Sequence, residues 1–115
     1  LTHDNMNQIL GGADLIVDCL DNGASRRLVQ SYARTHSVPC LHGALAPNGQ
    51  FGRVVWDAHF QIDDETGQGQ ATCEDGAHLP FIMMVASHMA EAIKQYLDKN
   101  VCQGAEIHSH GFIRT

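Results

Sequence analysis

One stretch of fourteen residues, ADLIVDCLDNGASR at positions 13–26, constrains the fold more than the rest of the chain. Its apolar run at residues 15–17 follows two glycines and suits a strand buried on both faces, which is typical of a central strand in a parallel sheet. Asp18 and Asp21 come at the carboxyl end of this strand, where open α/β sheets bind their ligands. Arg26 follows about one helical turn into the next element. Two carboxylates and a guanidinium at this place suit a magnesium–polyphosphate substrate.

These residues also have a purely structural explanation, in which they only start a helix. Asn22 or Ser25 can cap the helix expected over residues 24–36, and the dipole at its N-terminus favours Asp21. The apolar face of this helix is formed by Leu28, Val29, Tyr32 and Ala33. Arg26 lies away from that face and is expected to point to solvent or ligand. The pattern alone leaves both the capping and the ligand-binding explanation open.

Composition restricts the number of domains and the classes of partner. A chain of 115 residues allows a single domain, which is small for a complete nucleotide-binding enzyme. A net charge of -6 with only seven lysines and arginines gives no basic stripe for nucleic acid, and no apolar run approaches the length needed to span a membrane. No leader sequence is visible in the polar first residues, and the four cysteines form no Cys-x-x-Cys pair. A reducing, cytoplasmic location is therefore expected.

Periodicity predicts an α/β chain with a mainly parallel sheet and flanking helices. The expected elements are the tail of a helix at 1–10, a strand at 15–20, a helix at 24–36, a strand through Cys40 and Leu41, a strand at 50–56, a helix at 79–100 and an edge strand at 105–113. Residues 57–76 combine acidic residues, three glycines and little apolar periodicity, so they are expected to form a mobile loop.

Several motifs along the chain resemble those of one protein family. The run Asp18-Cys19-Leu20-Asp21-Asn22, followed by Arg26, resembles the Asp-Cys-x-Asp-Asn-x-x-x-Arg signature of the ubiquitin-activating-enzyme-like superfamily, whose small members adenylate sulfur-carrier proteins in thiamin and molybdopterin biosynthesis. Four further motifs follow in the order found in the family: Val38-Pro39 with Gly43-Ala44, Gly49-Gln50, Thr72-Cys73-Glu74 with Gly76 and Pro80, and Ala90-Glu91-Ala92-Ile93-Lys94. The resemblance extends from the first residue to about residue 100.

The resemblance implies a nucleotide site at the first motif, with ATP and Mg²⁺ as cofactors. Asp21 is the expected Mg²⁺ ligand near the phosphates, since Mg²⁺ takes one or two carboxylates together with phosphate oxygens and water. Asp18 is expected either to assist it or to bind backbone within the sheet. Asn22 and Arg26 are expected at the nucleotide.

The resemblance also implies a role for Cys73, as a nucleophile that forms a persulfide or a thioester with the activated carrier. The neighbouring acids Glu74 and Asp75 do not activate this thiol, because a negative charge disfavours the thiolate. An inert loop cysteine is therefore the open alternative.

No structural metal centre is expected. Many small relatives hold a zinc ion with two Cys-x-x-Cys pairs that this chain lacks, so no zinc site is expected. His108 and His110 lie on one face of the last expected strand, a spacing that suits a metal, yet no third ligand is identifiable. His42, His78 and His88 are no better placed.

The glycine-rich strand, turn and helix with which such domains start has no counterpart before Leu1. The chain is therefore expected to be one partial domain over residues 1–115, the C-terminal half of a Rossmann-like fold, and to be inactive alone. In the intact protein, the expected function is ATP-dependent adenylation of the C-terminal glycine of a ubiquitin-like sulfur carrier. The alternatives are a non-catalytic dimerisation or carrier-docking module and a dinucleotide-binding oxidoreductase fragment. The missing half of the sheet would leave the flank of the first strand uncovered, which predicts docking to another chain or a homo-oligomer.

Overall fold

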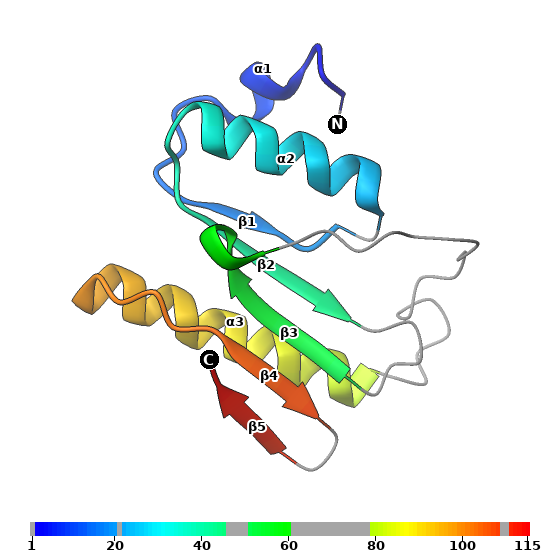
Figure 1. Ribbon diagram of the computed structural model, residues 1–115, viewed down its shortest axis with the longest axis vertical. Coiled ribbons are helices and arrows are strands. Elements are labelled where there is room, and N and C mark those ends of the chain that lie inside the picture. Colours follow the sequence, from blue (N-terminus) through cyan, green and yellow to red (C-terminus); the bar gives the residue numbers. More distant parts are fainter. Residues whose placement is uncertain (1, 21, 46–50, 61–78, 109–110) are drawn as a thin grey trace.

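The computed structural model describes residues 2–20, 22–45, 51–60, 79–108 and 111–115. Along the chain, the elements are α1 (Met6–Leu10), β1 (Ile16–Asp18), α2 (Gly23–Thr35), β2 (Cys40–Leu45), β3 (Phe51–Trp56), the 3₁₀ turn η1 (Asp57–His59), α3 (Leu79–Lys99), β4 (Ala105–His108) and β5 (Gly111–Arg114). Figure 1 shows the strands as one twisted sheet, with α2 near the β1 end and α3 lying across the middle.

The sheet is mixed rather than mainly parallel, although the predicted α/β class is confirmed. Its strand order is β1-β2-β3-β4-β5, in which β1 and β2 are parallel and the other three pairs are antiparallel. A parallel pair needs a crossover of a dozen or more residues, and α2 supplies it between β1 and β2. Only five residues separate β2 from β3, and two separate β4 from β5, so these pairs are antiparallel. The fold is compatible with part of a Rossmann-like domain.

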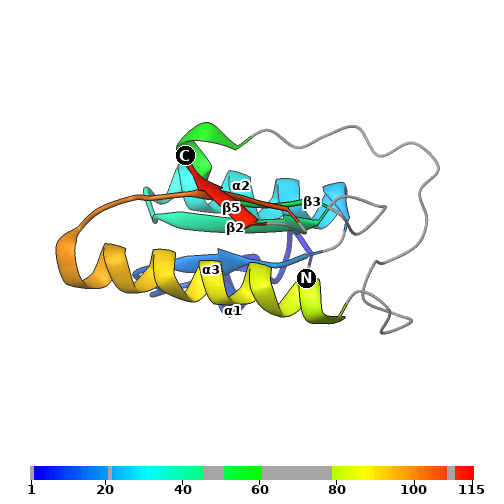
Figure 2. The same cartoon turned by 90° about the horizontal axis from the view of Figure 1, so that it is seen from below.

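The helices cover opposite faces of the sheet, which Figure 2 shows nearly edge-on. α3 packs on β2, β3 and β4 and closes a core of Leu41, Val54, Trp56, Phe81, Val85, Met89, Ala92, Ala105 and Ile107. α2 lies on the other face, and a second core gathers Met6, Ile16, Val29, Tyr32, Ala33 and Cys40. Successive residues of a strand point to opposite faces, so β2 contributes side chains to both cores.

Two glycines allow α3 to lie close to the sheet. A Cβ atom on Gly43 of β2 would overlap the thioether of Met89. A Cβ atom on Gly52 of β3 would lie 2.6 Å from a methyl group of Val85, which is closer than real Cβ contacts allow. Both glycines therefore serve close packing, the second against a stiff β-branched side chain.

Three predicted elements differ from the structure. The strand β1 is not covered on both faces, because Val17 is 43% exposed; α3 packs on the strands that follow it. The last predicted strand is a hairpin of β4 and β5 instead of one edge strand. The loop expected from residue 57 starts with η1 and the buried ring of Phe60, since contacts with α2 and β2 hold this turn. Residues 61–76 of that loop lie outside the described residues.

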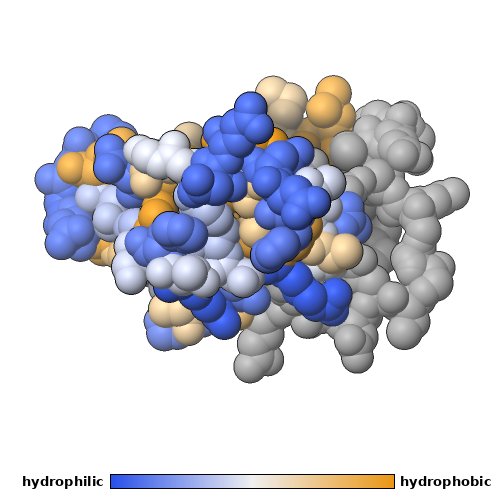
Figure 3. Space-filling view, turned by 90° about the horizontal axis from the view of Figure 1, so that it is seen from above, coloured by the Kyte–Doolittle hydropathy of each residue, from blue (hydrophilic) through white to orange (hydrophobic). Residues whose placement is uncertain are grey.

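The surface on the side of α1 and α2 is mainly hydrophilic. Figure 3 shows this side from above the view of Figure 1, with hydrophobic residues only scattered over it. Among the helices that the structure describes, none is both long and apolar enough to cross a membrane.

Candidate functional site

The connection from β1 to α2 carries the sequence motif Asp-Cys-Leu-Asp-Asn. The Asp18 carboxylate turns back on its own chain, where its Oδ1 accepts a hydrogen bond from the Leu20 backbone N–H at 2.9 Å. Asn22 caps α2, because its side-chain oxygen accepts a hydrogen bond from the Ser25 backbone N–H at 2.8 Å. Asp21 lies between these two anchored points and outside the described residues, so its role as an Mg²⁺ ligand stays a prediction.

Arg26 is buried, whereas the sequence predicted that it points to solvent or ligand. Its Nη1 donates to Asp18 Oδ2 at 3.0 Å, and its Nη2 donates to the backbone carbonyl of Gly43 at 2.7 Å. Asp18 is only 1% exposed, and a carboxylate so deeply buried needs a positive partner. The first turn of α2 lies beside the end of β1 and supplies that partner. The contact of Arg26 with a nucleotide stays a prediction.

His42 and Asp57 are site residues that the sequence did not predict. His42 is fully buried, and its two ring nitrogens face two carboxylates: Nδ1 lies 2.5 Å from Asp18 Oδ2, and Nε2 lies 2.7 Å from Asp57 Oδ1. The Phe60 ring stacks on the imidazole with centroids 4.0 Å apart, and it separates the ring from solvent. The parallel register of β1 and β2 sets Asp18 beside His42. Knowledge of this register is what would have predicted the contact.

Asp57 anchors the far end of this network to α2. Its Oδ2 accepts a hydrogen bond from Arg34 Nε at 2.7 Å, and its Oδ1 accepts one from Gln30 Nε2 at 2.9 Å. Burial by itself raises the pKa of Asp57, but the hydrogen bonds from Arg34, Gln30 and His42 outweigh it, so the pKa lies below its usual value. Asp57 is therefore held as an anion, and η1 is tied to the β1–α2 turn through His42.

The thiols of Cys19 and Cys40 are not activated. Burial raises the pKa of the Cys19 thiol, and the Asp18 carboxylate raises it further against a weaker opposing effect of Arg26. Burial, together with Asp57 and Asp18, raises the pKa of Cys40 to about 12. Cys73 lies outside the described residues, so its role as a nucleophile stays a prediction.

Among the described residues, no three His, Cys, Asp or Glu side chains gather in a way that could hold a metal ion. Asp18 could not serve Mg²⁺ in this arrangement, because one of its oxygens accepts from Leu20 and the other faces Arg26 and His42. Of the two aspartates in the motif, this leaves Asp21 for such a role. His110, the partner of His108 in the dismissed metal pair, lies outside the described part of the chain.

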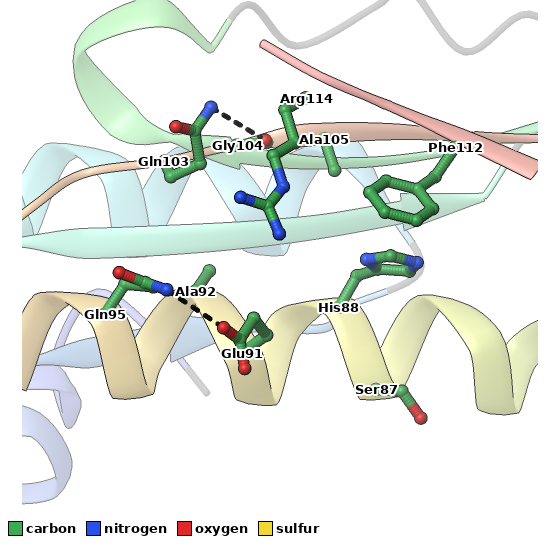
Figure 4. Close-up of a pocket in the computed structure, with 10 residues that line it drawn as sticks. All are labelled: Ser87, His88, Glu91, Ala92, Gln95, Gln103, Gly104, Ala105, Phe112 and Arg114. Atoms are coloured by element: carbon green, nitrogen blue, oxygen red, sulfur yellow. Dashed lines mark hydrogen bonds between the residues drawn. The ribbon is translucent and has the colours of Figure 1, made fainter.

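A groove of about 170 Å³ lies far from this site, between α3 and the last two strands (Figure 4). The rings of His88 and Phe112 lie 4.2 Å apart at one end, Gln95 and Gln103 lie at the other, and Arg114 points toward the helix between them. The strands β2 and β3 separate the groove from β1. Pockets for nucleotide-sized ligands usually measure about 300 Å³ or more, so this groove is too small for ATP.

Comparison with known proteins places the chain in a family. A model described as the ThiF family matches residues 1–114. The chain is 30% identical over 102 residues to the protein named adenylyltransferase and sulfurtransferase UBA4 of Meyerozyma guilliermondii. This match covers 82% of the chain and 24% of that protein, so the chain spans about a quarter of its length. Both matches confirm the superfamily resemblance drawn from the sequence motifs.

Proposed function

The chain belongs to the ThiF family, and on that premise we propose that it takes part in the ATP-dependent adenylation of the C-terminal glycine of a ubiquitin-like sulfur-carrier protein. The observation that carries this proposal is the motif turn at the carboxyl end of β1, where Asp18 fixes the backbone at Leu20 and Asn22 caps α2. Asp21 directly precedes the capping residue in the sequence, and the N-terminus of α2 favours negatively charged ligands. In the proposal, the glycine-rich nucleotide loop comes from the rest of the intact protein.

In the proposed reaction, a carboxylate oxygen of the carrier's terminal glycine attacks the α-phosphorus of ATP. The bond between this phosphorus and the oxygen that bridges to the β-phosphate breaks, and pyrophosphate leaves with the bonding electrons. Catalysis of such a displacement consists of holding the reacting atoms in line and stabilising the negative charge. Mg²⁺, when bound, neutralises phosphate charge, and Asp21 is its proposed ligand because the carboxylate of Asp18 is occupied.

Asn22 is proposed to contact the nucleotide, and Arg26 is proposed to support the turn that holds the site. Asn22 is exposed and fixes the start of α2, so it stands where a phosphate or ribose could be bound. Arg26 supports the site from beneath, because its two guanidinium nitrogens already bind Asp18 and the Gly43 carbonyl. This division gives the arginine a role in holding the turn rather than in neutralising phosphate.

We propose that Cys73 acts after adenylation, when its thiolate attacks the acyl carbon of the carrier adenylate, so that a thioester forms and AMP leaves. A Cys73 persulfide, loaded by a separate sulfane-sulfur donor, would attack the same carbon and form an acyl disulfide as AMP leaves. Neither step needs a thiol during the attack on ATP. Replacement of Cys73 by serine should therefore spare pyrophosphate exchange and eliminate a carrier adduct that reducing agent releases. An undiminished adduct on non-reducing gels would identify Cys73 as an inert cysteine.

The proposed partners are the carrier and a second copy of the protein. The outer edge of β5 lies at the end of the described sheet, and the neighbouring side chains of Phe112 and Ile113 are 47% and 59% exposed. An open edge with apolar residues is a common place for another chain to bind. A cytoplasmic location is proposed as well, since Cys19, Cys40 and Cys102 are free thiols.

The test replaces Asp21 by asparagine in the intact protein and measures carrier-dependent ATP–pyrophosphate exchange. Loss of the anionic Mg²⁺ ligand should reduce exchange by about a hundredfold or more, equivalent to ~2.7 kcal/mol of activation energy. Asp14→Asn is the matched control, because Asp14 is an exposed aspartate just before β1 and should leave exchange unchanged.

The alternatives predict other outcomes of the same experiment. A non-catalytic docking module would bind the carrier without any exchange in the wild-type protein. An oxidoreductase fragment would bind a nicotinamide dinucleotide in preference to ATP. Exchange by the Asp21→Asn variant within about tenfold of wild type would remove Asp21 from the mechanism.

A further inference from the structure

The imidazole of His42 joins two carboxylates that do not touch each other. Asp18 comes from β1 and Asp57 from η1, and the His42 ring nitrogens lie 2.5 Å and 2.7 Å from them. Each ring nitrogen of His42 thus has one carboxylate oxygen within hydrogen-bond distance, and the imidazole links β1 to η1. The other charged groups that face these carboxylates are the guanidinium groups of Arg26 and Arg34, both from α2.

This bridge acts on the motif turn through the second oxygen of Asp18. While His42 and Arg26 hold Oδ2, Oδ1 is aimed at the Leu20 backbone N–H, 2.9 Å away. A carboxylate oxygen held by two side chains has little freedom to move, so the carboxylate has little freedom to rotate. The position of the Leu20 backbone therefore depends on contacts made at His42, on the neighbouring strand.

We propose that His42 is a positioning residue for the nucleotide site, which fixes the carboxylate of Asp18 and with it the backbone turn that leads to Asp21. This inference deepens the proposed function and rests on it for its catalytic consequence. The bridge also ties η1 to the same turn.

The experiment replaces the imidazole of His42 by an amide, which is uncharged and can also form hydrogen bonds at two atoms. In the His42→Gln variant, the amide nitrogen can still donate to Asp18, but the amide oxygen then faces the Asp57 carboxylate and repels it. Adding Asp57→Asn supplies a donor for that oxygen and restores a continuous chain of hydrogen bonds. Hydrogen exchange of the Leu20 backbone amide in the intact protein reports the position of the turn whether or not the protein adenylates a carrier.

The His42→Gln variant should accelerate Leu20 amide exchange by about tenfold or more, and the double variant should recover to within about threefold of wild type. Where pyrophosphate exchange is measurable, the KM for Mg–ATP should follow the same order. Leu41→Val is the control, because it weakens the α3 core on the same strand without touching the bridge. The proposal is overturned if Leu20 exchange in His42→Gln equals that of the control, or if the second substitution fails to slow it.

Discussion

Replacement of Arg26 by glutamine should destabilise the protein, whereas the same replacement at Arg27 should not. The two arginines are neighbours on α2, but Arg26 is 8% exposed and Arg27 lies on the exposed side. Without Arg26, the carboxylate of Asp18 keeps His42 but loses its guanidinium partner, and the Gly43 carbonyl loses a donor. Breaking a buried ion pair from one side typically costs about 3–5 kcal/mol. Because His42 still faces the carboxylate, we expect the lower end, about 3 kcal/mol.

This loss is large against the ~5–15 kcal/mol by which domains are usually stable. Urea unfolding of the intact protein measures it. With an m value of about 1.5–2 kcal/mol/M, the midpoint should fall by about 1.5–2 M for Arg26→Gln. The Arg27→Gln variant should stay within about 0.5 kcal/mol of wild type. Equal stability of the two variants would refute this reasoning, and weakened ATP binding by a fully stable Arg26→Gln variant would mean that the guanidinium faces the nucleotide.

Acidification of an Asp57 variant and alanine substitutions at two closely packed glycines provide two further tests. Hydrogen bonds hold the pKa of Asp57 below its usual value, so its stabilising effect is complete above the unfolded-state pKa of about 4 and is lost as the pH falls through the lower folded-state pKa. Asp57→Asn should therefore lose less stability than wild type on acidification below about pH 5. An equal fall of the urea midpoint in both proteins over this pH range would contradict this. Gly52→Ala should cost about 1–3 kcal/mol because it meets the rigid Val85. Gly43→Ala should cost less in the same urea assay because Met89 is flexible, and an equal or larger loss would contradict this difference.

The order of the elements could be predicted because local patterns determine it. The apolar run before Asp18 gave β1, and the helical spacing of apolar residues gave α3 with bounds within one residue. A strand was predicted at residues 50–56, and β3 covers Phe51–Trp56. The antiparallel direction of that strand follows from the five-residue connection before it, which the prediction of a mainly parallel sheet did not take into account.

The buried network could not be predicted, because it depends on contacts between distant parts of the chain. Arg26 stands on the polar side of α2 by helical periodicity, yet it is buried because Asp18 lies beneath it. His42 appears in the sequence as one of eight histidines, and only the parallel register of β1 and β2 brings it to Asp18. Asp57 was assigned to a loop because no local pattern shows that Arg34 and Gln30 bind it.

The antiparallel pairing of β3 with β4 has a consequence for synthesis of the protein. About fifty residues lie between the end of β3 and the start of β4. At a translation rate of about 5–20 residues per second, β3 exists for several seconds before its partner strand has been made. An unpaired strand edge invites pairing with other nascent chains, and a charged residue within the strand discourages it. Arg53, in the middle of β3, is suited to protect the growing chain during this interval.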